Sequence, residues 1–149
     1  MKKIYLVVMM LVGAFSLIAQ TDPAMYPVGQ TAAGKKHKIV FQLTTDDTLA
    51  HKSLMKQLNN ITSIAPNTKI EVVCHGPGLY MLIKGKSPVQ EKITALKKKD
   101  IVFMACEFSM SERNVTKDKI IPEAGFVKTG IIEIVTRQEE GWSYIKSGF

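Results

Sequence analysis

The feature that most constrains this chain is a regular alternation of short strand-type segments with helix-type segments. Five segments are apolar or rich in β-branched residues, and we expect strands at residues 38–43, 69–74, 101–106, 126–128 and 142–146. The stretches between them carry helical periodicity or helix start and stop signals. This alternation predicts an α/β fold, a three-layer sandwich with a five-stranded, mainly parallel sheet. We expect the flavodoxin-like strand order 2-1-3-4-5.

The first two helices have the clearest signals. The first helix is predicted by the turn-and-cap cluster at 44–47 and by one apolar stripe with spacings of three and four residues. The stripe consists of Ala50, Leu54, Leu58, Ile61 and Ala65. Ser87 and Gln90 have capping-box spacing around Pro88, which predicts that the second helix starts there. We expect this helix to bury Val89, Ile93 and Leu96. The lysine run at 97–99 is interpreted as a solvated helix end rather than a nucleic-acid or membrane patch.

The later helices are less regular. The polar stretch 109–119 predicts one or two short helices. Residues 131–135 fit either a strand or a helix, but a parallel strand at 142–146 requires a crossover before it, so we expect a helix that ends before Gly141. His37 and His51 lie off the apolar faces and are expected to be exposed.

The N-terminal segment has the pattern of an export signal. Lys2 and Lys3 precede an apolar run of 16 residues at 4–19, which is shorter than the roughly 20 residues that span a bilayer. We therefore expect a signal peptide at 1–20, a flexible lead-in at 21–36 and a single domain at 37–149. The exported protein would be periplasmic and would not bind the membrane after signal removal.

Charge and cysteine content exclude several classes of protein. The net charge of +7 includes two lysines of the signal, which leaves about +5 for the domain, too little for a concentrated nucleic-acid patch. Two cysteines make neither a disulfide scaffold nor a four-ligand zinc site. We expect no metal, since no three potential ligands show metal-binding spacing.

Candidate site residues follow the predicted strands, because ligands of open α/β sheets bind at the carboxyl ends of the strands. The crevice would be lined after the first three strands by Thr44 and Asp46, by His75, Gly76 and Gly78, and by Cys106, Glu107, Phe108 and Arg113. Backbone N–H groups of the Gly76–Gly78 turn are candidates for binding an anion. His75 is a candidate for orienting a ligand or relaying a proton, and a histidine bonded to backbone is the alternative.

Cys106 is the candidate nucleophile of this crevice. It closes an apolar strand and precedes a helix start expected at Ser109 or Ser111, where backbone N–H groups favour a thiolate. Arg113 lies near enough in sequence to add positive charge. The alternative is a small core residue, since free cysteine is among the most buried residue types.

Two segments resemble the DsrE/DsrF-like family, and in particular its exported members. They are Ile-Glu-Val-Val-Cys-His-Gly-Pro-Gly-Leu at 70–79 and Val-Phe-Met-Ala-Cys-Glu-Phe-Ser-Met-Ser-Glu-Arg-Asn-Val at 102–115, and the resemblance extends to the end of the chain. It implies that Cys106 carries sulfur as a persulfide, that the protein is a homo-oligomer, a trimer or a hexamer, and that it has no metal or organic cofactor. Two residues depart from the family pattern. Phe108 stands where exported relatives commonly have a small polar residue, and Cys74 stands where a small or aliphatic residue is more usual.

The resulting hypothesis is a sulfur carrier or sulfurtransferase whose donor and acceptor are unknown. The alternative is a non-catalytic exported oligomer that binds a small anion or a protein partner, so enzymatic activity stays open. The apolar segment 79–83 also favours an oligomer, because it exceeds what one short helix needs. In the expected strand order Cys74 and Cys106 would lie about 9.6 Å apart, too far for a disulfide.

Overall fold

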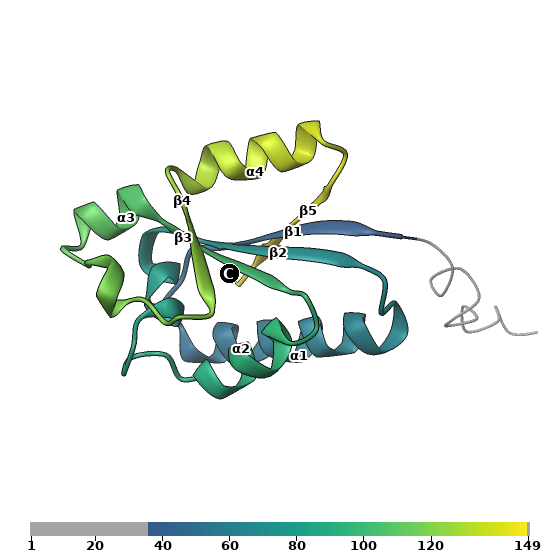
Figure 1. Cartoon of the computed structure of the whole chain (residues 1–149), viewed down its shortest axis with the longest axis horizontal. Coiled ribbons are helices and arrows are strands. Elements are labelled where there is room, and N and C mark those ends of the chain that lie inside the picture. Colours follow the sequence, from purple (N-terminus) through teal and green to yellow (C-terminus); the bar gives the residue numbers. More distant parts are fainter. Residues whose placement is uncertain (1–35, 149) are drawn as a thin grey trace, which may run out of the picture.

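The computed structural model describes residues 36–148. The predicted signal at 1–20 and nearly all of the lead-in at 21–36 lie outside the described residues. Five parallel strands form one sheet (Figure 1), namely β1 (Lys38–Leu43), β2 (Lys69–Cys74), β3 (Val102–Cys106), β4 (Ala124–Val127) and β5 (Ser143–Ser147). The observed β4 thus starts two residues before the predicted fourth strand, and β5 lies one residue later than predicted.

Helices cover both faces of the sheet. They are α1 (Thr48–Ile64), α2 (Gln90–Lys97), α3 (Glu107–Glu112) and α4 (Gly130–Glu139), with the 3₁₀ helices η1 (Gly76–Leu82) and η2 (Lys117–Lys119). Figure 1 shows α1 and α2 on one face and α4 on the other, which confirms the α/β sandwich. None of the helices within residues 36–148 is long and apolar enough to cross a membrane.

The predicted strand order is wrong in detail. The sheet has the order β4-β3-β2-β1-β5, so β1 lies between β2 and β5 instead of between β2 and β3. The reason is the handedness of the connections, because right-handed crossovers on one face add strands in one direction. Since α1 and α2 cover the same face, β1, β2 and β3 follow in sequence, and α4 on the other face returns β5 to the edge beside β1.

The main core lies between the sheet and the pair α1 and α2. Leu54, Leu58 and Ile93 are fully buried there, which confirms the apolar stripes of both helices. A second, smaller cluster lies under α4 and contains Val40, Val73, Val127 and Ile134. The two clusters thus cover both faces of the sheet at its centre.

The start of α1 follows the sequence signals, and that of α2 does not. Asp47 is the N-cap of α1, and its Oδ1 accepts a hydrogen bond of 2.8 Å from the N–H of Leu49. The predicted capping box of the second helix is wrong. Ser87 Oγ accepts instead from the N–H of Val89 at 3.4 Å, and the helix begins at Gln90. The buried side chain of Val89 anchors that turn.

Two further expectations are overturned by tertiary packing. His51 is 1% exposed, because its Nε2 lies 2.8 Å from the carbonyl oxygen of Thr45 in the loop before α1; His37 is half-buried. The apolar segment 79–83 does not supply a free surface, since four of its residues are buried in this chain: Leu79, Met81, Leu82 and Ile83. Its apolarity therefore serves the core and is no argument for an oligomer.

Candidate functional site

Cys106 lies where two helices begin. It is the last residue of β3 and the N-cap of α3, and its side chain is 3% exposed. The N–H of Gly130, the first residue of α4, donates to Cys106 Sγ at 3.2 Å, and the carbonyl oxygen of Lys128 lies 4.0 Å from the same sulfur. An N–H donor at a helix start stabilises negative charge on the atom it faces. The sulfur thus accepts a hydrogen bond from the start of α4 and also faces a carbonyl oxygen that can accept from its thiol.

The helix contact at Cys106 differs from the one expected. The helix after β3 starts at Glu107, ahead of Ser109 and Ser111, and the N–H that binds the sulfur belongs to α4. Sequence reasoning missed Gly130 as a site residue. Its signal was the Thr129-Gly130 pair before an apolar run, since threonine is a preferred N-cap and Thr129 Oγ1 accepts from the N–H of Ile132.

Cys74 and Cys106 belong to opposite faces of the sheet. The register pairs Cys74 with Ala105, so Cys106 is one residue further along the neighbouring strand. Because successive side chains of a strand point to opposite faces, Cys74 lies in the main core and Cys106 lies toward α4. Both cysteines are free, but the expected separation by an intervening strand is wrong. Burial raises the pKa of the Cys74 thiol far above its ordinary value.

His75 follows β2 and lies beside the Cys106 environment. A Cβ atom on Gly130 would lie 3.0 Å from the Cβ of His75, so His75 packs against the residue that donates to the sulfur. The amide nitrogen of Gln42 lies 2.7 Å from His75 Nε2 and donates to it, while the Tyr144 hydroxyl donates to the Gln42 amide oxygen. Burial lowers the pKa of His75, which favours the neutral ring that such an acceptor requires.

The glycine turn after His75 has a structural role. Gly76 has a φ of +54°, which favours glycine, and its N–H donates to the buried Ser109 Oγ at 2.8 Å. A Cβ on Gly78 would lie only 2.2 Å from the carbonyl oxygen of Leu43, so only glycine fits against the end of β1. The N–H of Gly78 donates to the carbonyl oxygen of His75. Both N–H groups that we expected to face an anion are therefore already used.

Glu107 and Phe108 form the rim next to Cys106. The Glu107 carboxylate pairs at 2.6 Å with both Lys117 and Lys128, and hydrogen bonds from these lysines lower its pKa to about 2. Phe108 is 62% exposed, and its N–H donates to the carbonyl oxygen of Lys128 at 3.2 Å. Lys128 contributes to this rim twice, because its backbone carbonyl oxygen also lies near Cys106 Sγ.

The remaining candidates are Arg113, Thr44 and Asp46. Arg113 ends α3, pairs with Glu112 at 3.3 Å and lines a cavity on that side together with Ile83. No hydrogen bond within residues 36–148 joins Arg113 to Cys106. Thr44 is half-buried, and its carbonyl oxygen lies near Gly76, whereas Asp46 is exposed in the loop before α1. The described part of the chain contains no cluster of three or more His, Cys, Asp and Glu side chains that could hold a metal ion.

Comparison with known proteins gives the family and the fold of this chain. The sequence model of the DsrE/DsrF-like family matches residues 37–147. A protein of unknown function from Methanobacterium thermoautotrophicum, MTH1491, has a similar solved structure with 26% sequence identity and a TM-score of 0.72, over 74% of this chain and 99% of that one. The ychN protein of E. coli, at 8% identity and a TM-score of 0.61, covers 75% and 99% and shares the fold. No curated protein matches the sequence.

Proposed function

This chain belongs to the DsrE/DsrF-like family, and from that premise we propose that it carries sulfur as a persulfide on Cys106. The observation that carries the proposal is the hydrogen bond from the N–H of Gly130 to Cys106 Sγ. A sulfur carrier needs a thiolate nucleophile that can also leave again as a thiolate, and an N–H donor at a helix start supports both steps.

The transfer consists of two displacements with no net oxidation or reduction. The Cys106 thiolate attacks the outer sulfur of a donor persulfide, the new S–S bond forms on Sγ, and the donor leaves as a thiolate. An acceptor thiolate then attacks the outer sulfur on Cys106, and the cysteine leaves as a thiolate toward the N–H of Gly130. The neutral ring of His75 packs against Gly130 and keeps the start of α4 in place.

Access to Cys106 decides between this function and its alternative. Only 3% of Cys106 is exposed, so a donor reaches the sulfur only when the residues around it move. The same burial favours the alternative, a non-catalytic module in which Cys106 is a packing residue. Thiol reactivity of the folded protein separates the two, because a packing cysteine barely reacts with an alkylating reagent.

Loading with a sulfane donor tests the carrier function directly. We expect purified protein that has been incubated with inorganic polysulfide to gain one sulfur on Cys106, seen by peptide mass spectrometry. Cys106→Ser should abolish the gain, and Cys74→Ala, a matched change on the other face of the sheet, should keep it. Sulfur on Cys74, or no adduct on folded wild-type protein, would contradict the proposal and favour the packing role.

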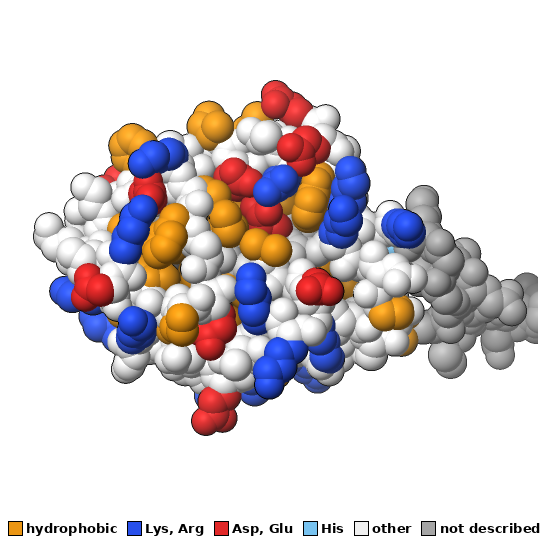
Figure 2. Space-filling model, viewed as in Figure 1, with side chains coloured by type: hydrophobic (Ala, Val, Ile, Leu, Met, Phe, Trp, Pro, Cys, Tyr) orange, Lys and Arg blue, Asp and Glu red, His pale blue; other side chains and the backbone are white. Residues whose placement is uncertain are grey.

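We also propose a homo-oligomer, a trimer or a hexamer, whose interface includes the surface of α3 and α4. Four large apolar side chains are exposed there: Phe108 (62%), Ile131 (53%), Ile132 (62%) and Val135 (42%). Figure 2 shows apolar side chains along the edge where α4 and α3 lie. Light scattering at micromolar concentration should give a multiple of the chain mass, and Ile132→Glu should reduce it. A monomer mass for wild-type protein would contradict this.

Export to the periplasm is part of the same proposal. Lys2, Lys3 and the apolar run at 4–19 support a cleaved signal. Mass spectrometry of protein recovered from the periplasm should find a chain that begins near residue 21. Intact protein found only in the cytoplasm would contradict export.

A further inference from the structure

A second candidate site lies on the other side of the sheet from Cys106. A cleft of about 460 Å³ runs between α1 and α2, and we call it the lysine cleft because four of its lining residues are Lys52, Lys56, Lys92 and Lys99. Asn59, Ala95 and Leu96 line the rest. The volume lies in the range of small-ligand pockets. Figure 1 shows α1 and α2 side by side on the face opposite α4.

The lysine cleft has an excess of positive charge. The α1 helix contains no Asp or Glu, and the one acid of α2, Glu91, lines a neighbouring cavity instead. None of the ion pairs within residues 36–148 uses any of the four lysines. Four like charges around one concavity repel one another, and a bound anion relieves that repulsion.

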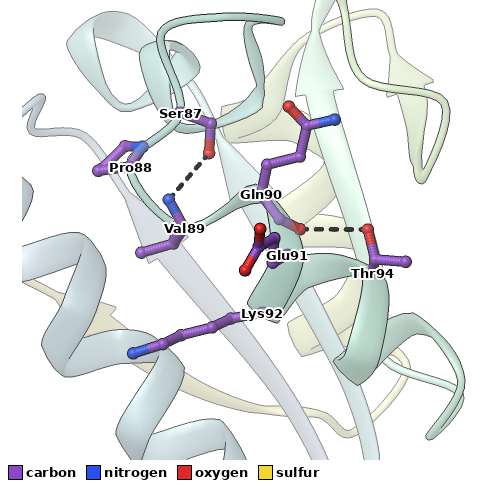
Figure 3. A pocket seen from close by; sticks show the side chains of 7 residues that line it. All are labelled: Ser87, Pro88, Val89, Gln90, Glu91, Lys92 and Thr94. Atoms are coloured by element: carbon purple, nitrogen blue, oxygen red, sulfur yellow. Dashed lines mark hydrogen bonds between the residues drawn. The ribbon is translucent and has the colours of Figure 1, made fainter.

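Two of the four lysines, Lys92 and Lys99, reach across the cleft from the α2 side toward α1. Lys99 Nζ donates to Asn59 Oδ1 at 2.9 Å and lies 3.5 Å from Thr62 Oγ1, so this side chain reaches from the turn after α2 to α1. Figure 3 shows Lys92 extending from α2 toward α1. Lys52 and Lys56 are one turn apart on α1 and therefore neighbours on its surface. Charges from both helices thus meet at one place.

We propose that the lysine cleft binds a ligand that carries at least two phosphate groups. Lysine is a compact point charge that binds phosphate, and four lysines line this one cleft. A singly charged anion would leave most of the repulsion in place. Ala95 and Leu96 offer a small apolar contact beside the charges. The phosphates belong either to a free phosphorylated compound or to a lipid headgroup.

Binding measurements with matched variants test this site. Inorganic pyrophosphate is titrated calorimetrically into the purified protein, and vesicles of phosphatidylcholine with cardiolipin, a lipid whose headgroup carries two phosphates, are used in a co-sedimentation assay. We expect the double variant Lys52→Gln and Lys92→Gln to lose at least about tenfold in affinity. The control, Lys97→Gln and Lys98→Gln, removes the same charge from the end of α2 outside the cleft and should change affinity by less than about twofold.

Each outcome bears on the proposal. Variant-sensitive binding of pyrophosphate without vesicle binding supports a free ligand, and variant-sensitive vesicle binding supports a headgroup. Failure of wild-type protein to bind either probe, or an equal loss in the control variant, would overturn the site. Circular dichroism and the thermal midpoint should be unchanged in both variants because all four substituted lysines are exposed. Lys56→Gln provides a second, independent test of the same cleft.

Discussion

The N–H of Gly130 donates a hydrogen bond to Cys106 Sγ over 3.2 Å and joins the start of α4 to the end of β3. These residues are 24 positions apart in the chain. The contact depends on close packing, since a Cβ on Gly130 would lie 3.0 Å from the Cβ of His75 and 3.1 Å from Val73 Cγ1. Gly130 therefore links the candidate nucleophile to the histidine beside it.

Gly130→Ala should both destabilise the protein and alter its thiol. The added methyl group has to push α4 away from His75, which we expect to cost about 1–3 kcal/mol. Movement of α4 also lengthens the N–H contact to Cys106. Denaturant unfolding measures the first effect, and the rate of sulfur loading from polysulfide, which should fall, measures the second.

Thr129→Ala is the matched control for that change. It removes the side-chain cap that accepts from the N–H of Ile132, so stability should fall by about 1 kcal/mol. The N–H of Gly130 stays in place, and sulfur loading should be retained. Equal loading rates in wild type and Gly130→Ala would contradict a role for this N–H.

Cys74 and Cys106 should both be free thiols within one chain, even after purification without reductant. Their strands are adjacent, but their side chains belong to opposite faces of the sheet, so no disulfide can form without breaking the sheet. Thiol counting on the unfolded protein should find two thiols, or one thiol and an adduct on Cys106. An intramolecular bridge in that assay would show that β2 and β3 do not have this register.

Arg137→Ala should be one of the most destabilising changes on the α4 side. The Arg137 guanidinium pairs at 2.8 Å with Glu71, a carboxylate that is 2% exposed, and stacks on Trp142. Leaving the buried carboxylate without its partner costs about 3–5 kcal/mol. Arg113→Ala, which breaks a pair with the exposed carboxylate of Glu112, should cost less than about 1 kcal/mol. Comparable losses in denaturant unfolding would be evidence against the buried pair.

Glu71 should also make stability depend on pH. Burial raises its pKa above the usual 4.5, although Arg137 acts in the opposite direction. The folded state therefore holds this proton more tightly than the unfolded state, so the contribution is present below pH 4.5 and is lost as pH rises through the folded pKa. Relative to wild type, Glu71→Gln should lack this decline in a pH series of unfolding curves. An unchanged profile would contradict it, and Glu112→Gln is the exposed control.

Leu54→Ala, Leu58→Ala and Ile93→Ala should each cost about 2–5 kcal/mol, because these side chains are fully buried between the helices and the sheet. Leu49→Ala is the control on α1, since Leu49 is 71% exposed and its loss should cost less than about 0.5 kcal/mol. Chemical denaturation measures all four. Similar values for Leu49 and Leu54 would mean that α1 is rotated about its axis.

Much of the fold was predictable because its signals are local. The stripe through Leu54 and Leu58, the cap at Asp47 and the choice of a helix at 131–135 each depend on a few neighbouring residues or on chain connection. The capping box at Ser87 failed because Ser87 Oγ accepts from the N–H of the buried Val89, one residue before the helix begins at Gln90. The prediction that His51 is exposed was wrong because its ring contacts the loop before α1 and is buried there.

The sequence by itself determined the strand and helix alternation, the family resemblance and the candidate Cys106. Only the tertiary structure decided which strands are neighbours, because that depends on which face each crossover helix covers, and no local pattern encodes the face. The face that each helix covers also determines which groups contact Cys106. Because α4 covers the far face, the N–H of its first residue, Gly130, donates to Cys106 Sγ. Arg113, at the end of α3, pairs with Glu112 instead of approaching the sulfur.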